Sequence, residues 1–541
     1  MPTFAAIDIG SNSCRLKIAR VVSHQLKTIA EDREVTRLGG SVFESGLVSP
    51  EAMALTLRAL KRFQRAVQTH GVDQIRVVAT AALRDARNAA AFQAWVKAET
   101  GWNLEIISGL EEARLIHLGV TSAEPDSSGR ILLLDLGGGS CEITLSEHKR
   151  IRETVSVPLG AVRLTEQFLP TDPAPAEGLL QMRQLIAREL RKAEKRIHPG
   201  EVAQVIATSG TAAALAEAAA AALAKSTAKA NAKSITKAGT KAGTKASAKS
   251  AAKRAARTAA AAFGMVPTAT VRKLAGRLAK LSLPAREAVP GIGPRRAEII
   301  VAGAAVYAEL FEIFDLPGFR YSPLGLRDGI LAQMLAAQDA RTSVHREFEH
   351  ERWQSVLATA RRYGVDVKKA EPVRAHAVQL FEELQPLHGL PPEYANWLAA
   401  AALLSDTGKF INHQGHHRHT QYIVSSSEIY GYSQLQRTIV SAIARYLGKS
   451  RPQPGDRALR NIPAEQHRNV QAAVVLLRLA EALNQDRASD VLRVRVKSFP
   501  KRIVLEIFPG KNGAELELWA LRREAVYFRE VFGRELLPAL V

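Results

Sequence analysis

Cysteine and aromatic residues are scarce in this sequence of 541 residues, which contains only Cys14 and Cys141 and is 6% aromatic. Two cysteines exclude a disulfide framework and a cysteine-rich zinc cluster. The sequence also lacks a run of about 18 apolar residues that would resemble a membrane span. Its start, MPTFAAIDIG, lacks the charged and apolar regions of a signal peptide. We therefore expect a cytoplasmic protein.

Acidic residues are few relative to basic ones, with 53 Asp and Glu against 74 Lys and Arg and a net charge of +21. This balance favours a polyanionic partner, which is nucleic acid, an anionic membrane or polyphosphate. Residues 221–262 contain no acid, and lysines stand at every fourth position from Lys225 to Lys253, followed by Arg254 and Arg257. We predict a disordered or partly helical insertion there, either an inert linker or an electrostatic antenna for a polyanion.

Outside this insertion, short apolar runs alternate with helical patterns in the N-terminal half, which indicates an α/β fold. The patterns predict strands at 4–9, 16–22, 75–79, 104–107, 131–136 and 142–145, and helices at 50–70, 89–100 and 111–120. A final turn and helix are expected at 321–334, followed by a polar connection at 339–346.

Two glycine-rich turns have closely similar sequences. Asp8-Ile-Gly10-Ser-Asn-Ser13-Cys14 matches Asp135-Leu-Gly137-Gly-Gly-Ser140-Cys141 in its aspartate, first glycine, serine and cysteine. This internal similarity predicts two related lobes that present similar hairpins. Glycines bring backbone N–H groups close to a phosphate, and paired aspartates can hold Mg²⁺. Two such hairpins with a metal ion would form a phosphoryl-transfer cleft.

The segments AAIDIGSNSCRLKIARV (5–21) and LLLDLGGGSCEIT (132–144) resemble the two phosphate-binding motifs of the actin-like ATPase superfold. More narrowly, they resemble the exopolyphosphatase and guanosine pentaphosphate phosphohydrolase family. Six further segments resemble family blocks in the same order: TRLGGSVFESGLV (36–48), VATAALRDARN (78–88), ISGLEEARLIHLGV (107–120), SVPLGAVRLTEQF (156–168), ATSGTAAAL (207–215) and YSPLGLRDGIL (321–331).

The resemblance covers residues 1–335 apart from the insertion. It implies two actin-like (ribonuclease H-like) lobes, 1–120 and 121–338, with a cleft between them. By the same resemblance, Glu112 matches the general base that activates water, and Asp8 and Asp135 match acidic residues tied to Mg²⁺ and catalysis.

Further matches place the remaining candidate residues. Glu142 matches an acid that supports the metal, Arg84 a phosphate-contacting arginine, and Arg37 a weaker phosphate-binding candidate. The expected phosphate cradles are Gly10, Ser11, Asn12, Ser13, Gly137, Gly138, Gly139 and Ser140. Cys14, Cys141 and Asp328 depart from the family pattern. The cysteines are either small buried hydrophobic residues or thiols whose modification inactivates the enzyme.

Residues 347–488 resemble the degenerate HD-type helical domain of long family members, most clearly in AALLSDTGKFINHQGHHRHTQYIV (401–424). Ser405-Asp406 replaces the His-Asp pair, His376 fits an upstream ligand position, and Glu481 stands where an aspartate is expected. We therefore infer no HD catalysis, although Asp406 leaves room for a weak metal site. His413, His416, His417 and His419 form, with Arg418, either a basic phosphate-facing surface or a metal site.

Residues 489–541 are expected to form a small α+β domain, with strands at 491–499 and 503–508 and a segment, 514–531, that begins as a strand and ends as a helix. The resemblance implies that the helical domain extends a polyanion channel or mediates formation of a homodimer.

The leading functional hypothesis is an Mg²⁺-dependent exopolyphosphatase that releases orthophosphate from the end of inorganic polyphosphate. The alternative is a guanosine pentaphosphate phosphohydrolase of the stringent response, which uses the same site. An ATP-using kinase or chaperone would need a nucleoside pocket, for which Ser209-Gly210-Thr211 is the candidate. The last hypothesis is a polyanion binder without catalysis, which Asp8, Glu112 and Asp135 argue against.

Overall fold

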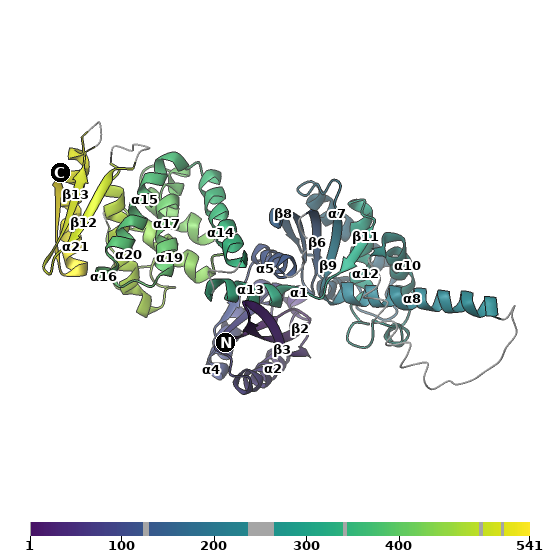
Figure 1. The fold of residues 1–541 in the computed structure, drawn as a ribbon. Helices are drawn as coiled ribbons and strands as arrows, with labels where there is room; N and C mark the ends of the chain where they lie inside the picture. The colour runs from purple at the N-terminus through teal and green to yellow at the C-terminus, as the bar shows by residue number, and fades with distance from the viewer. Residues whose placement is uncertain are drawn as a thin grey trace. The chain divides into compact units, whose positions relative to one another are not determined.

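The computed structural model describes residues 2–122, 129–235, 265–338, 343–448, 450–485, 491–509 and 513–541. The chain divides into two compact units, Met1–Arg346 and Glu347–Val541. Figure 1 shows the first unit as two lobes, each built on a sheet. None of the helices in the described ranges is long and apolar enough to cross a membrane.

Lobe I contains a five-stranded sheet in the order β3-β2-β1-β4-β5, in which β1 pairs antiparallel with β2 and parallel with β4. Its core packs α2 and α4 against β1, β2 and β4. In chain order the elements are β1 Thr3–Ile9, β2 Ser13–Val22, β3 Gln25–Val35, α1 Val42–Ser45, α2 Pro50–Thr69, β4 Gln74–Ala79, α3 Ala81–Asp85, α4 Ala89–Thr100, β5 Leu104–Ile106 and α5 Gly109–Thr121.

Lobe II contains a six-stranded sheet in the order β10-β11-β9-β6-β7-β8. Strand β6 pairs antiparallel with β7 and parallel with β9, as β1 pairs with β2 and β4 in lobe I. The two lobes therefore share one topology. The elements are β6 Arg130–Leu136, β7 Cys141–Glu147, β8 Arg150–Val157, α6 Ala161–Phe168, α7 Ala176–Glu194, β9 Gln204–Thr208, α8 Ser209–Ile235, β10 Val266–Pro267, α10 Thr268–Leu278, α11 Leu283–Glu287, α12 Ile300–Ile313, β11 Gly318–Tyr321 and α13 Leu326–Gln338.

Helices α5 and α13 connect the cores of the two lobes. A single buried cluster joins Phe4 of β1 and Leu133 of β6 to Leu115 and Ile116 of α5 and Ile330 of α13. Figure 1 shows these two helices between the sheets. Because α5 carries Glu112 near its first turn, this packing fixes the predicted base relative to both lobes.

The second unit begins as a set of helices and ends in a small sheet of order β12-β13-β14, and one apolar cluster runs through both parts. Its elements are α14 Ser343–Arg362, α15 Val367–Glu383, α16 Gln385–His388, α17 Glu393–Leu404, a 3-10 helix Thr407–Phe410, α18 His416–Ser426, α19 Gln434–Arg445, a 3-10 helix Ala464–Gln466, α20 His467–Ala482, β12 Arg493–Ser498, β13 Arg502–Phe508, α21 Glu515–Phe532 and β14 Glu535–Leu540.

Most predicted elements are confirmed, but two predicted segments differ, and several strands were not predicted. Residues 514–531 do not begin as a strand, because α21 occupies Glu515–Phe532. The connection predicted at 339–346 is partly helical, since α14 starts at Ser343. Strands β3, β8, β9, β10, β11 and β14 were not predicted. The division of the second unit into an HD-like domain, 347–488, and a small domain, 489–541, stays a prediction.

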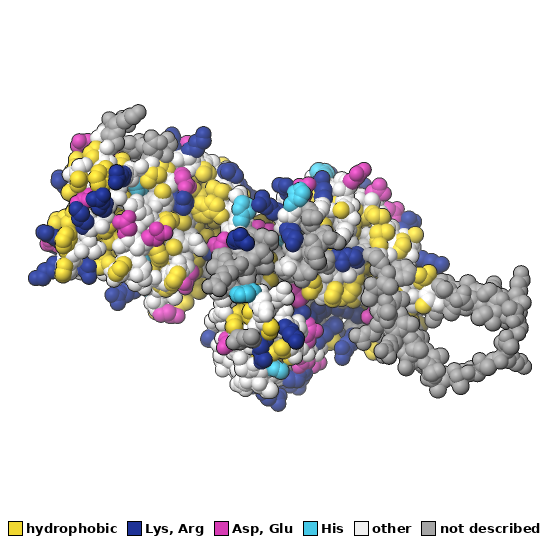
Figure 2. All heavy atoms as spheres, in the orientation of Figure 1, with side chains coloured by type: hydrophobic (Ala, Val, Ile, Leu, Met, Phe, Trp, Pro, Cys, Tyr) yellow, Lys and Arg dark blue, Asp and Glu magenta, His cyan; other side chains and the backbone are white. Residues whose placement is uncertain are grey.

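The predicted insertion, 221–262, falls partly outside the described residues. The backbone of α8 remains helical to Ile235, which agrees with the partly helical alternative for the first part of the segment. On the face seen in Figure 2, Lys and Arg side chains are spread over the surface of both units rather than gathered in one patch.

Candidate active site

The two glycine-rich turns form matching hairpins. In lobe I, Asp8 lies opposite Arg15 in the β1–β2 register, and the amide of Gly10 donates to the carbonyl oxygen of Ser13 at 3.1 Å. In lobe II, Asp135 lies opposite Glu142 in the β6–β7 register. There the amide of Gly137 donates to the carbonyl oxygen of Ser140 at 2.9 Å. The predicted internal repeat is thus present in register and in turn geometry.

The tips of the two hairpins contact each other closely. A Cβ atom added to Gly138 would lie 2.9 Å from Cβ of Ser11, and one added to Gly139 would lie 2.5 Å from Cβ of Ala81. These glycines are therefore needed because lobe I residues occupy the space of a side chain. The contact brings both turns to the wall of one cavity.

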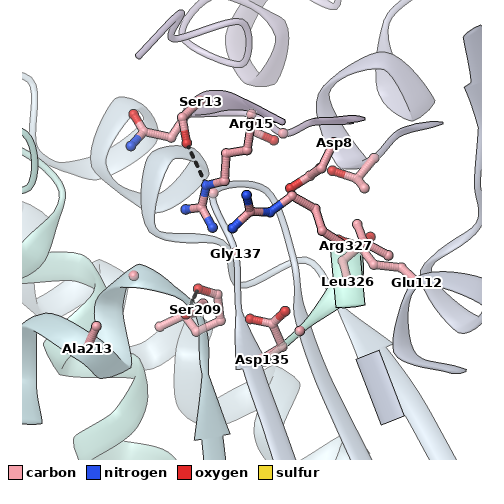
Figure 3. A pocket seen from close by; sticks show the side chains of 18 of the residues that line it. Asp8, Ser13, Arg15, Glu112, Asp135, Gly137, Ser209, Ala213, Leu326 and Arg327 are labelled. Atoms are coloured by element: carbon pink, nitrogen blue, oxygen red, sulfur yellow. Dashed lines mark hydrogen bonds between the residues drawn. The ribbon is translucent and has the colours of Figure 1, made fainter. Parts of the chain in front are cut away.

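That cavity has a volume of about 430 Å³. Figure 3 shows it with Asp8, Arg15 and Arg327 on one side and Asp135, Gly137 and Ser209 on the other. The predicted site residues that line it are Asp8, Gly10, Ser11, Asn12, Ser13, Glu112, Asp135, Gly137, Gly138, Gly139 and Ser140.

Three of the predicted carboxyl groups, those of Asp8, Glu112 and Asp135, line this cavity, whereas Glu142 does not line it and lies opposite Asp135 in the β6–β7 register. Burial raises the pKa of Asp8, which Arg15 partly opposes, and burial raises the pKa of Asp135 to about 6. Burial and the neighbouring Asp135 raise the pKa of Glu142 to about 7. Burial and Glu142 raise the pKa of Glu112 well above its usual range. Such a group of mutually repelling acids is a place where a cation is favourable.

Glu112 is held by its helix and by Arg84. Ser108 caps α5 by accepting a hydrogen bond from the amide of Glu111 at 3.1 Å, which places Glu112 in the first turn. The Arg84 guanidinium donates to Oε2 of Glu112 at 3.4 Å and to the carbonyl oxygen of Ile107 at 2.8 Å. Arg84 therefore orients the predicted base, although it is not among the residues that line the cavity.

The acids of lobe II retain unused acceptors. Oδ1 of Asp135 and Oε2 of Glu142 are buried without a hydrogen-bond partner, while Oε1 of Glu142 accepts from Ser156 at 2.8 Å. Buried acceptors of this kind are rare in folded proteins unless a ligand or ion completes them. Asp8 and Asp135 line the same cavity, and their carboxylates, with Glu142 next to Asp135, fit Mg²⁺, which takes one or two carboxylates and completes its shell with water and phosphate oxygens.

No three His, Cys, Asp or Glu side chains gather closely enough to hold a metal by themselves in the part of the chain that the structure describes. The predicted histidine cluster of the second unit is accordingly not such a group in the described residues, although the rings of His416 and His417 lie 3.9 Å apart. His376, which is fully buried on α15, does not belong to such a group in the described residues either. An Mg²⁺ ion at the predicted site would therefore need further ligands from the substrate and water.

Arg37, predicted to bind phosphate, lies outside the cavity. Its side chain is 60% exposed and pairs with Glu298 at 2.7 Å, and Arg37 does not line the cavity. The assignment of Arg37 as a phosphate ligand stays a prediction.

Cys14 and Cys141 are fully buried, and burial raises the pKa of both thiols well above the usual range. Both cysteines therefore have the environment of small core residues.

Sequence reasoning missed the basic side chains of the cavity. Arg15, Arg33, Arg296 and Arg327 line it together with Lys17. Burial and neighbouring arginines lower the pKa of Arg296 to about 9. Arg15 and Lys17 stand inside one of the quoted segments and Arg327 inside another, but none was singled out, whereas Arg33 and Arg296 lie outside the quoted segments and join the others only through the fold.

Residues 17–338 match the model of the Ppx/GppA phosphatase family, and residues 352–523 match Ppx/GppA phosphatase, domain III. Among solved structures, an exopolyphosphatase from Cytophaga hutchinsonii is 24% identical with a TM-score of 0.51 over 62% of this chain and 98% of its own. An exopolyphosphatase-like protein is 26% identical with a TM-score of 0.51 over 61% of this chain and 96% of its own.

An Aquifex aeolicus member of the Ppx/GppA family is 26% identical, with a TM-score of 0.47 over 62% of this chain and 99% of its own. The first family model alone spans more than half of the sequence. The cleft with its paired hairpins and acidic cluster agrees with a hydrolase of phosphate compounds. The chain therefore belongs to the Ppx/GppA phosphatase family and is a phosphatase.

Proposed function

We propose that the chain is an exopolyphosphatase that hydrolyses the terminal phosphoanhydride bond of inorganic polyphosphate and releases orthophosphate. One observation carries this proposal: Glu112, two glycine-rich turns and several arginines line a single cavity of about 430 Å³. The turns supply amides for the terminal phosphoryl group, and the arginines suit the negative charge of a longer phosphate chain.

Glu112 is the proposed general base. Its raised pKa makes the carboxylate a stronger acceptor for a proton of the attacking water, and Arg84 works against this shift and holds the group in place. The water oxygen forms a bond to the terminal phosphorus as the bond to the bridging oxygen breaks. The proton passes to Glu112, and the shortened polyphosphate leaves with the electron pair of the broken bond.

Asp8 and Asp135 are the residues that would hold Mg²⁺, with Glu142 supporting Asp135 from the neighbouring strand. When bound, the ion neutralises the phosphoryl oxygens as charge moves in the transition state. Ser11 and Asn12 carry buried polar atoms without partners at the same wall, Oγ and Nδ2, and these are positioned to donate to phosphate oxygens.

The test measures phosphate release from long polyphosphate, guanosine pentaphosphate and ATP in parallel, each with Mg²⁺ and with a chelator. We expect the highest kcat/KM for polyphosphate and loss of activity in the chelator. A higher kcat/KM for guanosine pentaphosphate would transfer the assignment to that substrate. Release from none of the three would contradict a phosphoanhydride hydrolase.

A further inference from the structure

Three consecutive carbonyl groups of the second glycine-rich turn are held by helix α6. The backbone amides of Ala161–Arg163, the first residues of α6, donate to the carbonyl oxygens of Gly137 and Gly138 at 2.8 to 3.0 Å. The next carbonyl oxygen, that of Gly139, accepts instead from a side chain, at 2.8 Å from Nε of Arg163. The guanidinium of Arg163 thus completes the support that the helix gives to the turn.

This support directs the amides of the turn away from α6. In a planar trans peptide, the carbonyl group of one residue and the N–H group of the next point in opposite directions. The carbonyl groups that α6 fixes therefore turn the N–H groups of Gly138, Gly139 and Ser140 to the other side of the turn. These amides donate to no acceptor among the described residues, and the three residues line the cavity. The amides are therefore placed to bind a phosphoryl group.

Arg163 also reaches lobe I. Its Nη2 donates to Oδ2 of Asp85 at 2.5 Å, and its guanidinium carbon lies 4.0 Å from the ring centroid of Phe43. Asp85 is the last residue of α3, and Arg84 on the same helix donates to the carboxylate of Glu112. One guanidinium thus contacts the second turn and also the short helix that orients the proposed base.

The first glycine-rich turn is held by backbone groups instead. The carbonyl oxygen of Ser11 accepts from the amide of Gly39 at 2.8 Å, and that of Asn12 accepts from two amides of the segment after β3 at 3.1 Å. This segment supports the turn of lobe I as α6 supports the turn of lobe II. Within the described ranges, Arg163 is therefore the side chain that distinguishes the two supports.

We propose that Arg163 is a positioning residue, which directs the amides of the second turn at the terminal phosphoryl group and aligns that turn with Glu112. Arg163 does not line the cavity, so it acts through Gly139 and Asp85 and not through contact with the substrate. A guanidinium suits this role because its planar donors engage two acceptors at once. The inference rests on the proposed function, since alignment with a base matters when water attacks the phosphoryl group.

The test compares Arg163→Gln and Asp85→Asn in the full chain. We expect kcat for long polyphosphate to fall about tenfold in Arg163→Gln while KM changes less than about twofold, because misalignment weakens the transition state more than the bound chain. Asp85→Asn keeps the contact with Gly139 and should lower kcat about threefold. The side chain of Asp85 is 39% exposed, so this variant keeps the fold even if the loss of Arg163 disturbs α6.

Arg191→Gln is the matched control, because Arg191 is an exposed arginine of α7 in the same lobe, outside the cavity. It should leave kcat and KM unchanged. A wild-type kcat in Arg163→Gln, or an increase in KM alone, refutes the positioning role. A wild-type kcat in Asp85→Asn refutes the link to α3.

A double-mutant cycle with Glu112→Gln distinguishes alignment from a general loss of structure. If Arg163 aligns the phosphoryl group with the base, its loss costs less once the base is gone. Arg163→Gln should then lower kcat less than about threefold in the Glu112→Gln background. An equal loss in both backgrounds would show that Arg163 acts independently of Glu112 and would refute the alignment.

A binding measurement separates this inference from the proposed function. Inorganic phosphate is titrated, with Mg²⁺, into the wild type, Arg163→Gln and Arg191→Gln. We expect about fivefold weaker binding in Arg163→Gln alone, because the amides of the second turn are no longer held in place. That result supports the inference even if another phosphate compound proves to be the substrate. Unchanged affinity refutes it even if the wild-type protein is an active exopolyphosphatase.

Discussion

Burial holds the imidazole of His117 in its uncharged state, at a position away from the carboxyl groups of the cavity. It is 2% exposed on α5, and its Nε2 lies 2.7 Å from Oγ of Ser146 on β7. Burial, with a smaller contribution from Arg114, lowers the pKa of His117 to about 3. The folded protein therefore binds no proton at this ring under mildly acidic conditions.

The consequence is a loss of stability in acid. Below the ordinary pKa of about 6.5 the unfolded chain takes up a proton at His117 and the folded chain does not, so the free energy of unfolding falls by about 1.4 kcal/mol at pH 5.5. His117→Gln removes this contribution. We expect its urea midpoint to change less between about pH 7.5 and about pH 5.5 than that of the wild type.

The exposed His198 supplies the control, since His198→Gln should retain the wild-type pH dependence. A wild-type slope in His117→Gln would show that His117 is protonated in the folded protein, against the lowered pKa.

At the residue scale, the proposed catalytic side chains were easier to predict from the sequence than the arginines of the cavity. Asp8, Glu112 and Asp135 stand within short motifs, and all three line the cavity as expected. Arg33 and Arg296 belong to segments without a recognisable pattern, and arginines on a basic chain are usually solvated. Only the pairing of β2 with β3 and the packing of the lobes bring them together.

At the scale of elements, the crossing of α5 and α13 fixes the geometry of the cleft. A Cβ atom on Gly119 would lie 2.5 Å from the carbonyl oxygen of Gly325, and one on Gly329 would overlap the carbonyl oxygen of Leu115. The two backbones therefore touch. Since Glu112 lies on α5 and Arg327 on α13, the contact sets the position of the proposed base relative to an arginine of the cavity.

Gly119→Ala should force the two helices apart. We expect a loss of about 2 kcal/mol in the free energy of unfolding, as for other overpacked interiors, together with a lower kcat. Thermal denaturation and steady-state kinetics measure both effects. Gly276→Ala is the control, because nothing lies within 4 Å of the added methyl group on α10 and the change should be neutral or slightly stabilising. Equal behaviour of the two variants would contradict the close crossing.

Elements with a clear apolar period were predicted well, whereas those that depend on tertiary contacts were not. The alternation in ELELW, from Glu515, indicates a strand, but Glu517 is only 3% exposed and accepts a hydrogen bond from the amide of Gln485 at 3.1 Å. This buried contact is compatible with the helix that forms. Strand β3 carries many charges, and β14 contains Pro538, so neither has the pattern of a typical strand.

At the scale of the whole molecule, the net charge of +21 indicated a polyanionic partner without locating its site. The surface in Figure 2 does not locate it either, since basic side chains are widely spread there. The cavity of the first unit offers a location, because Arg15, Arg33 and Arg296 line it without a carboxylate ion pair among the described residues. The composition thus predicts the class of ligand, and the fold predicts where it binds.

The most direct test of the account compares long-polyphosphate hydrolysis by the wild type, Glu112→Gln and Glu153→Gln, an exposed acid on β8. We predict that Glu112→Gln lowers kcat at least about 100-fold while polyphosphate binding is retained, because only the proton acceptor is lost. Glu153→Gln should match the wild type. If Glu112→Gln hydrolyses polyphosphate at the wild-type rate, Glu112 is not the base, and the assignment of this cleft as the catalytic site is contradicted.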